Sequence, residues 1–312
     1  MKVRFAVSVA GGPPDPASLG DVVAEAEEQG FDTIWLSDVP MLASTDPMLG
    51  VAFAAARSSR MHLGINLIPF GSTRFVTAHR LAQLDRLAGG RLLVTLVPGL
   101  DQPGERQALG TSGRRRGDLI EEMLPELRCW WRGEEVDLGD GTTAKLAVTP
   151  TQAPLEVWLG GSGPGAIRRA GRVADGWLGA RVPPERAGEI RREILRQAEM
   201  SGRTIDPEHF GLSLAYARSA ADLDRAKQIR PLRLAPHPPE PRNAPHGAGY
   251  DRSYEAIPVG VSALRDMVGR LVDQGLSKFV VRPAAPPEEA SGGSGWPAEL
   301  EWLADALLDL QS

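Results

Sequence analysis

Short apolar runs alternate with longer amphipathic segments along most of the chain. In residues 16–29, for example, Leu19, Val22 and Val23 recur on one helical face, and Gly30 follows as a stop signal. Strands that alternate with helices in this way are typical of βαβ units and a parallel sheet. The strands that we expect are 3–9, 33–37, 62–68, 91–97, 157–159, 175–179, 210–217 and 278–282. The helices that we expect are 16–29, 46–59, 74–87, 118–131, 164–174, 184–201, 262–274 and 298–310.

This set of elements predicts one (β/α)8 TIM barrel of the α/β class. Such a barrel takes roughly 250 residues, and more with insertions, so we expect the 312 residues to form a single domain, 1–312. A doubly wound open sheet is the main alternative. It normally has fewer strands, and no Gly-x-Gly-x-x-Gly motif follows the first strand here.

Two insertions interrupt the alternation, at about 133–154 and 230–258. The first contains Gly139-Asp140-Gly141, which predicts a small hairpin laid over the barrel rather than built into it. The second carries many prolines between Pro231 and Pro245 and therefore cannot be a core helix or strand. It is either a lid over the active site or a disordered loop.

The composition narrows the class of protein further. An apolar fraction of 42% allows a sizeable core, and a net charge of −5 gives no electrostatic reason to expect nucleic acid as a partner. No apolar stretch reaches the roughly 18 residues that would suggest a membrane span. Cys129 is the single cysteine, which excludes an internal disulfide, and the first residues read as a strand rather than a signal peptide. We therefore expect a cytoplasmic protein.

The loop after the fifth expected strand is the most informative candidate site. In a barrel, the active site lies where the strands end and the following loops begin. Gly160, Gly161 and Gly163 let backbone amides approach a ligand closely, Ser162 adds a hydroxyl, and a helix N-terminus follows. These residues predict a cofactor-binding phosphate cradle, with a tight strand-to-helix turn as the alternative.

Three charged residues also stand at expected strand ends. Asp38 and Asp101 are the candidate catalytic carboxylates, although either could instead form a turn or cap a helix. Arg282 could contact an anionic cofactor or pair with a carboxylate of the barrel. We interpret the run 114–116, three arginines, as a solvated face. The histidines are too scattered to suggest a metal site, and there is no Ser-His-Asp set.

Several segments carry motifs that belong together. They include EEQGFDTIWLSD at 27–38, LAQLDRLAGGR at 81–91 and WLGGSGP at 158–164, with further similarity at 46–47, 60–64, 174–177 and 260–281. In this order they resemble the luciferase-like monooxygenase superfamily, over most of the chain except 133–151 and 230–258. The resemblance implies a barrel whose open mouth binds coenzyme F420 or reduced FMN, with the phosphate on Gly161, Ser162 and Gly163.

The resemblance also marks a departure. Many deazaflavin-dependent members carry a catalytic histidine directly after the aspartate of the second strand, and here that position is Val39. Dehydrogenase chemistry that relies on this histidine is therefore not supported by the motif. Some members carry a glutamate after the fourth strand, close to the position of Asp101. We favour Asp101 as proton donor and Asp38 as an architectural residue.

Three functions follow as alternatives. The first is F420-dependent hydride transfer to or from a small organic substrate at the barrel mouth. The second is a monooxygenase that receives reduced FMN from a separate reductase, and the third is a non-catalytic flavin- or deazaflavin-binding protein. We also expect a homodimer formed through the second and third barrel helices, because the segment 47–57 leaves little polar surface for a helix that faces solvent.

Overall fold

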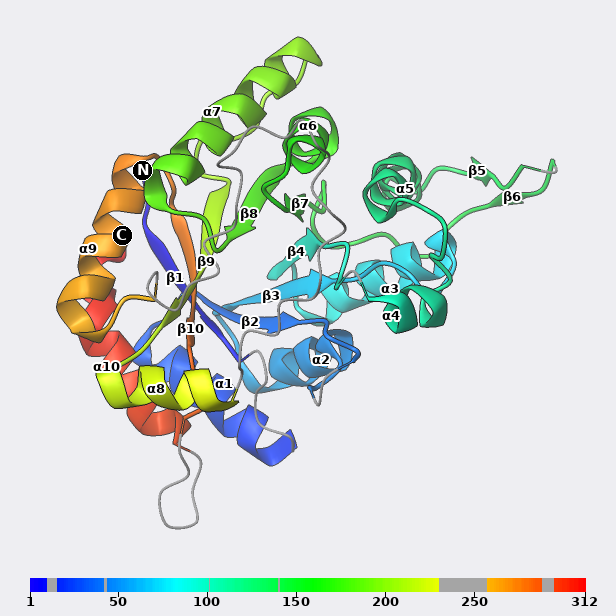
Figure 1. Cartoon of the computed structure of the whole chain (residues 1–312). Coiled ribbons are helices and arrows are strands. Elements are labelled where there is room, and N and C mark those ends of the chain that lie inside the picture. The colour runs from blue at the N-terminus through cyan, green and yellow to red at the C-terminus, as the bar shows by residue number, and fades with distance from the viewer. Residues whose placement is uncertain (10–15, 42–43, 101, 140, 230–256, 288–294) are drawn as a thin grey trace.

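Eight parallel strands form a closed barrel in the computed structural model, which describes residues 1–9, 16–41, 44–100, 102–139, 141–229, 257–287 and 295–312. Going round the barrel, the order is β1, β2, β3, β4, β7, β8, β9 and β10, so each strand lies beside the next barrel strand in the sequence (Figure 1). Their bounds are β1 (Arg4–Ser8), β2 (Thr33–Ser37), β3 (His62–Leu67), β4 (Leu92–Leu96), β7 (Val157–Gly160), β8 (Gly176–Ala180), β9 (Phe210–Tyr216) and β10 (Lys278–Pro283). The expected TIM barrel is confirmed.

Helices surround the barrel in Figure 1 and bury the outer faces of the strands. Their bounds are α1 (Pro16–Gln29), α2 (Pro47–Arg57), α3 (Arg74–Leu87), α4 (Pro103–Ala108), α5 (Arg116–Trp131), α6 (Pro164–Val173), α7 (Pro184–Met200), α8 (Ala220–Ile229), α9 (Gly260–Asp273) and α10 (Trp296–Leu307). A 3-10 turn, Leu308–Leu310, follows α10. The sequence pattern missed α4 and α8, which are short helices after β4 and β9. None of the helices in the described part is long and apolar enough to cross a membrane.

The first insertion forms the hairpin that the sequence predicts. Its strands β5 (Val136–Asp137) and β6 (Thr143–Ala144) pair antiparallel. The expectation that the hairpin lies over the barrel is wrong, because Figure 1 shows it extending away from the barrel beyond α5. Leu138, near its tip, is 54% exposed, so this end buries no apolar face against the barrel. Most of the second insertion, 230–256, lies outside the described residues, and so does the choice between a lid and a disordered loop.

Side chains alternate between the barrel interior and the surrounding helices. On each strand, every second residue points into the barrel, and the register aligns these residues on neighbouring strands as one inner set. The apolar members of this inner set make a cluster separate from the main core. These members are Ala6, Trp35, Leu93, Trp158, Leu178 and Val280. The main core between strands and helices contains the alternate residues, such as Val7, Ile34 and Leu63. Trp35 and Trp158 thus lie in the barrel interior, whereas Trp177 packs in the outer core.

Conspicuous motif residues lie at the amino-terminal ends of the strands. Glu27 accepts backbone hydrogen bonds from the loop before β3, and Asp85 accepts them from the loop before β7. Arg91 donates to a carbonyl oxygen of the loop before β3 at 2.8 Å. Lys278 Nζ donates to Asp32 Oδ2 at 2.5 Å in the same end of the barrel. This end of a TIM barrel serves stability rather than chemistry, so these residues hold the scaffold together.

Candidate functional site

An apolar floor closes the barrel below its carboxyl-terminal mouth. Trp35 and Trp158 are the largest members of the inner cluster, and both are almost fully buried. Glycines on neighbouring strands leave room for the two indoles. A Cβ at Gly64 would lie 2.1 Å from Trp35 Cε3, and a Cβ at Gly176 would lie 2.5 Å from Trp158 Cε2. Both indoles are therefore closely packed, and the Trp158 ring lies 5.4 Å from the ring of His209, at the end of the barrel where β9 begins.

Polar side chains line one wall of the mouth. Ser37 on β2 pairs in register with Asn66 on β3, and Asn66 pairs with Thr95 on β4. Asn66 Nδ2 donates a hydrogen bond to Ser37 Oγ at 2.9 Å. Asn66 Oδ1 and Thr95 Oγ1 are buried and have no hydrogen-bond partner in the described structure. Sequence reasoning missed these residues because their shared direction follows only from the strand register.

The glycine-rich loop follows β7 as expected. Gly161 has a φ of +103°, and a Cβ there would lie 2.8 Å from the Cβ of Ala166. Trp177 Nε1 donates to the Gly161 carbonyl oxygen at 2.8 Å and fixes the turn. Ser162 is 9% exposed, and Gly163 is the N-cap residue of α6 without a side-chain capping bond. The first amides of α6 thus lack an intrahelical partner, and the phosphate cradle stays a prediction that this geometry supports.

Asp38 joins the ends of β2 and β3. Its backbone N–H donates to the Asn66 carbonyl oxygen at 2.8 Å, and its Oδ2 accepts from the Ile68 N–H at 3.2 Å. Burial raises the pKa of the Asp38 carboxyl, the Ile68 hydrogen bond lowers it, and the charges of Asp46 and Glu105 raise it, so the pKa lies above its ordinary value. The Asp38 carboxylate therefore links β2 to β3 through its hydrogen bond with Ile68, and it binds a proton more tightly than an ordinary aspartate does.

A buried ion pair holds the loop after β4. The guanidinium of Arg116 contacts the Glu105 carboxylate, and both side chains are almost wholly buried. Arg116 Nη1 also donates to the carbonyl oxygens of Pro98 at 2.7 Å and Leu100 at 3.1 Å. A Cβ at Gly99 would lie 2.7 Å from Glu105 Oε1, so this loop position is restricted to glycine.

The expectation that all three arginines of 114–116 form a solvated face is therefore only partly right. The side chains of Arg114 and Arg115 are 58% and 82% exposed, as a solvated face requires. Arg116 is buried instead, because α4 brings Glu105 against it. Pro103 at the start of α4, with Glu105 in its first turn, is the sequence signal that could have predicted this helix.

The structure gives less information on the other two candidate residues, Asp101 and Arg282. Asp101 lies outside the described residues, although the loop that precedes it is held by Arg116. Arg282 lies on β10 in register with Ala215, which places it in the inner set at the mouth, and it is partly buried. No group of His, Cys, Asp or Glu side chains in the described ranges could hold a metal ion.

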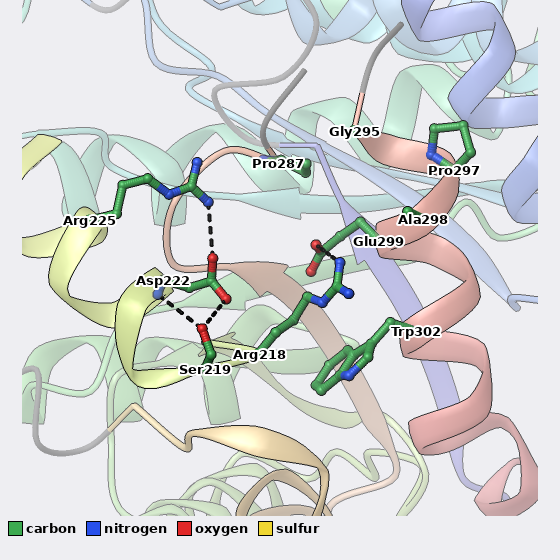
Figure 2. A pocket seen from close by; sticks show the side chains of 10 residues that line it. All are labelled: Arg218, Ser219, Asp222, Arg225, Pro287, Gly295, Pro297, Ala298, Glu299 and Trp302. Carbon is green, nitrogen blue, oxygen red and sulfur yellow. Dashed lines mark hydrogen bonds and ion pairs between the residues drawn. The ribbon is translucent and has the colours of Figure 1, made fainter. Parts of the chain in front are cut away.

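A cavity of about 560 Å³ lies on the rim of the barrel, between the starts of α8 and α10 (Figure 2). In its wall, Arg218 lies over the Trp302 ring and donates to Glu299 at 3.3 Å, while Arg225 contacts Asp222 at 3.3 Å. These carboxylates balance the two described arginines of the wall, so the cavity has no evident preference for an anion. Burial, followed by the charge and hydrogen bond of the adjacent Glu299 carboxylate, raises the pKa of Tyr216 well above its usual value, so Tyr216 stays protonated near neutral pH.

Comparisons of the sequence with known proteins agree on one family. A sequence model described as luciferase-like monooxygenase matches residues 2–269. The chain is 28% identical over 222 residues to a 5,10-methylenetetrahydromethanopterin reductase from Methanolobus tindarius, covering 69% of this chain but only 65% of the reductase. It is 25% identical over 301 residues to an F420-dependent glucose-6-phosphate dehydrogenase from Nakamurella multipartita, covering 89% and 86% of the two chains.

Solved structures share the fold over their full length. One is an F420-dependent secondary alcohol dehydrogenase in complex with an F420–acetone adduct, with a TM-score of 0.79, 15% identity and complete coverage of both chains. Another is the oxygenating constituent of 3,6-diketocamphane monooxygenase from Pseudomonas putida in complex with FMN. Its TM-score is 0.72 at 15% identity, with 99% of this chain and 97% of that chain covered. At such identities the likeness concerns the barrel itself.

Proposed function

The chain belongs to the luciferase-like monooxygenase family, and we propose that it is an oxidoreductase that uses coenzyme F420. In this proposal, hydride passes between the cofactor and a small organic substrate held at the barrel mouth. The observation that carries it is the match to an F420-dependent dehydrogenase over 89% of this chain. A cytoplasmic location and a homodimer formed through α2 and α3 belong to the same proposal.

The residues at the mouth fit a cofactor with a flat ring and a phosphate. An apolar cluster closes the barrel interior, and the wall opposite β9 carries the unpaired polar atoms of Asn66 and Thr95. Gly161, Ser162 and Gly163 would hold the phosphate together with the first amides of α6. Arg282, in the inner set on β10, would contact an anionic part of the cofactor or substrate. A phosphate can approach the backbone of this loop only if its residues are small, and a side chain at Gly161 would in any case meet Ala166.

The bound cofactor would supply the hydride, and the chain must supply position and a proton. Reduction of a carbonyl group consumes one hydride and one proton, so a carboxyl group at the mouth completes the balance. Val39 has no titratable group and cannot take this role. Asp101, the next residue in the sequence after the loop that Arg116 fixes, is our proposed donor, while Asp38 ties β2 to β3. The closed barrel wall and its apolar floor exclude water from below.

A monooxygenase that receives reduced FMN from a separate reductase is the second candidate. The FMN-containing neighbour shares the fold, and Val39 removes the histidine that many F420-dependent members use. In this case the same loop would hold the FMN phosphate. The two cofactors differ in their ring and tail, so direct binding separates the candidates.

Titration of the purified protein with F420 and with FMN tests the proposal. Fluorescence of each cofactor gives its dissociation constant, and we expect F420 to bind more tightly than FMN. Tighter binding of reduced FMN, followed by oxygen uptake in the presence of a flavin reductase, would favour the monooxygenase. Failure to bind either cofactor would reject both candidates.

A further inference from the structure

Two unpaired polar atoms lie side by side inside the barrel mouth. Asn66 and Thr95 are register partners on β3 and β4, and both belong to the inward-facing set. Thr95 is 1% exposed, and neither its Oγ1 nor Asn66 Oδ1 has a hydrogen-bond partner in the described structure. Buried polar atoms are nearly always paired, and an exception requires an explanation such as a bound water or ligand.

The hydrogen bond to Ser37 decides what Asn66 can recognise. Asn66 uses Nδ2 to donate to Ser37 Oγ, which leaves Oδ1 as an acceptor for an N–H or O–H group. The Thr95 hydroxyl can donate to an oxygen beside that group. An acceptor next to a donor matches a ligand edge on which an N–H stands beside a carbonyl oxygen.

We propose that Asn66 and Thr95 recognise the imide edge of a planar heterocycle bound at the barrel mouth. Asn66 Oδ1 accepts from the imide N–H, and Thr95 Oγ1 donates to the neighbouring carbonyl oxygen. The inference rests on the proposed function, since it requires a heterocyclic cofactor in this site. Flavins and deazaflavins share the imide edge, so the inference holds for either cofactor. The pair sets specificity for the ring, whereas the glycine-rich loop contacts the phosphate.

Isosteric variants separate recognition from packing. Asn66→Leu and Thr95→Val remove the polar atoms with little change in volume, and Thr95→Ser keeps the hydroxyl. Ser213→Ala is the matched control, because Ser213 is also in the inward-facing set but lies on β9, across the barrel from β3. Thermal unfolding of each variant checks that the barrel is intact.

The readout is the dissociation constant of FMN or F420, whichever binds the unaltered protein, measured by fluorescence without turnover. We expect Asn66→Leu and Thr95→Val each to weaken binding about three- to tenfold, the size of one net hydrogen bond. Thr95→Ser and Ser213→Ala should bind within about twofold of the unaltered protein. A ring methylated at the imide nitrogen should bind the unaltered protein less tightly, and Asn66→Leu should reduce that penalty.

The outcomes distinguish the two proposals. If the unaltered protein binds neither cofactor, the proposed function and this inference both fail. If it binds one of them and both isosteric variants bind it equally well, only the inference fails. Equal affinity for the methylated and unmethylated rings would also overturn it.

Discussion

Arg116 and Glu105 form an ion pair in which both side chains are almost completely buried. Arg116 Nε donates to Thr111 Oγ1 at 2.8 Å, and its Nη1 reaches two carbonyl oxygens of the loop after β4. The pair therefore connects α4 and α5 to the rim of the barrel mouth. The negative charge of Glu105 also contributes to the raised pKa of Asp38.

Removal of the arginine should be strongly destabilising. Arg116→Met leaves the Glu105 carboxylate buried without its partner, and such changes cost about 3–5 kcal/mol. Urea unfolding measures the free energy of unfolding. Arg115→Met is the matched control, because the side chain of Arg115 is 82% exposed and its replacement should change stability by less than about 0.5 kcal/mol. Equal stability of the two variants would show that the buried pair contributes little.

Gly161 and Gly163, in the loop that we propose as a phosphate cradle, should respond differently to valine. Gly161→Val is strained at a φ of +103° and meets Ala166, so it should lower stability by at least about 1–3 kcal/mol. Gly163 has a φ of −76°, and nothing lies within 4 Å of a Cβ added there, so Gly163→Val should fold normally. If the loop holds a phosphate, Gly163→Val should still weaken cofactor binding about tenfold, the loss of at least one charge-assisted bond. Unchanged affinity in a folded Gly163→Val protein would reject the phosphate cradle.

Variants of the two candidate carboxylates, Asp38 and Asp101, should separate chemistry from architecture. Asp101→Asn should slow the chemical step by roughly a hundredfold or more if Asp101 is the proton donor. Asp38→Asn keeps an oxygen that accepts from the Ile68 N–H and should retain most of the turnover. Single-turnover kinetics with the best substrate from a screen gives both rates. A fully active Asp101→Asn protein would mean that the proton comes from solvent or substrate.

The raised pKa of Asp38 also predicts how the stability of the protein depends on pH. The folded state binds the Asp38 proton more tightly than the unfolded state does, so the stability from this group is complete below the ordinary pKa and is lost as the pH rises through the raised value. Asp38→Asn cannot ionise. Its stability relative to the unaltered protein should therefore increase as the pH rises through that range, which urea midpoints at several pH values can measure.

Glu27 should show the opposite pH dependence. Burial raises the pKa of Glu27, but hydrogen bonds from the backbone N–H groups of Met61, Arg60 and Ser59 outweigh it and lower the pKa to about 2. The stabilisation is thus present above the ordinary value of 4.5 and is lost as the pH falls toward 2. Glu27→Gln should cost about 1–2 kcal/mol at pH 7 and much less at pH 3. Glu28→Gln, on an exposed neighbour, should have little effect at either pH.

The exposed part of α2 should mediate the proposed dimer. Val51 and Ala54 face the core, but Leu49 is 71% exposed and Phe53 is only partly buried. Leu49→Glu places a charge in an apolar contact and should shift a dimer to monomers at micromolar concentration. Sedimentation velocity measures the mass. A monomeric mass for the unaltered protein would reject the interface, and Leu87→Glu on α3 tests its second half.

Local periodicity was enough to predict the scaffold. The bounds expected for the first helix and the second strand, 16–29 and 33–37, agree with α1 and β2. Alternation of strands and helices also predicted the closed barrel, because a parallel strand needs a crossover helix before the next strand. The glycine-rich loop after β7 and Asp38 after β2 could be located in the same way, since the ends of the strands define the mouth.

Tertiary structure decided which residues meet. Nothing in the run of arginines distinguishes Arg116 from its exposed neighbours until α4 carries Glu105 back against it. The pairing of Asn66 with Thr95 depends on the register of β3 and β4, which a shift of one residue would abolish. Sequence by itself determined the barrel strands, the longer helices and their order, although not the short helices α4 and α8, because hydrophobic period and turn residues act over a few positions. Burial, pKa shifts and shared hydrogen bonds depend on segments distant in the chain, so only the folded barrel could assign them.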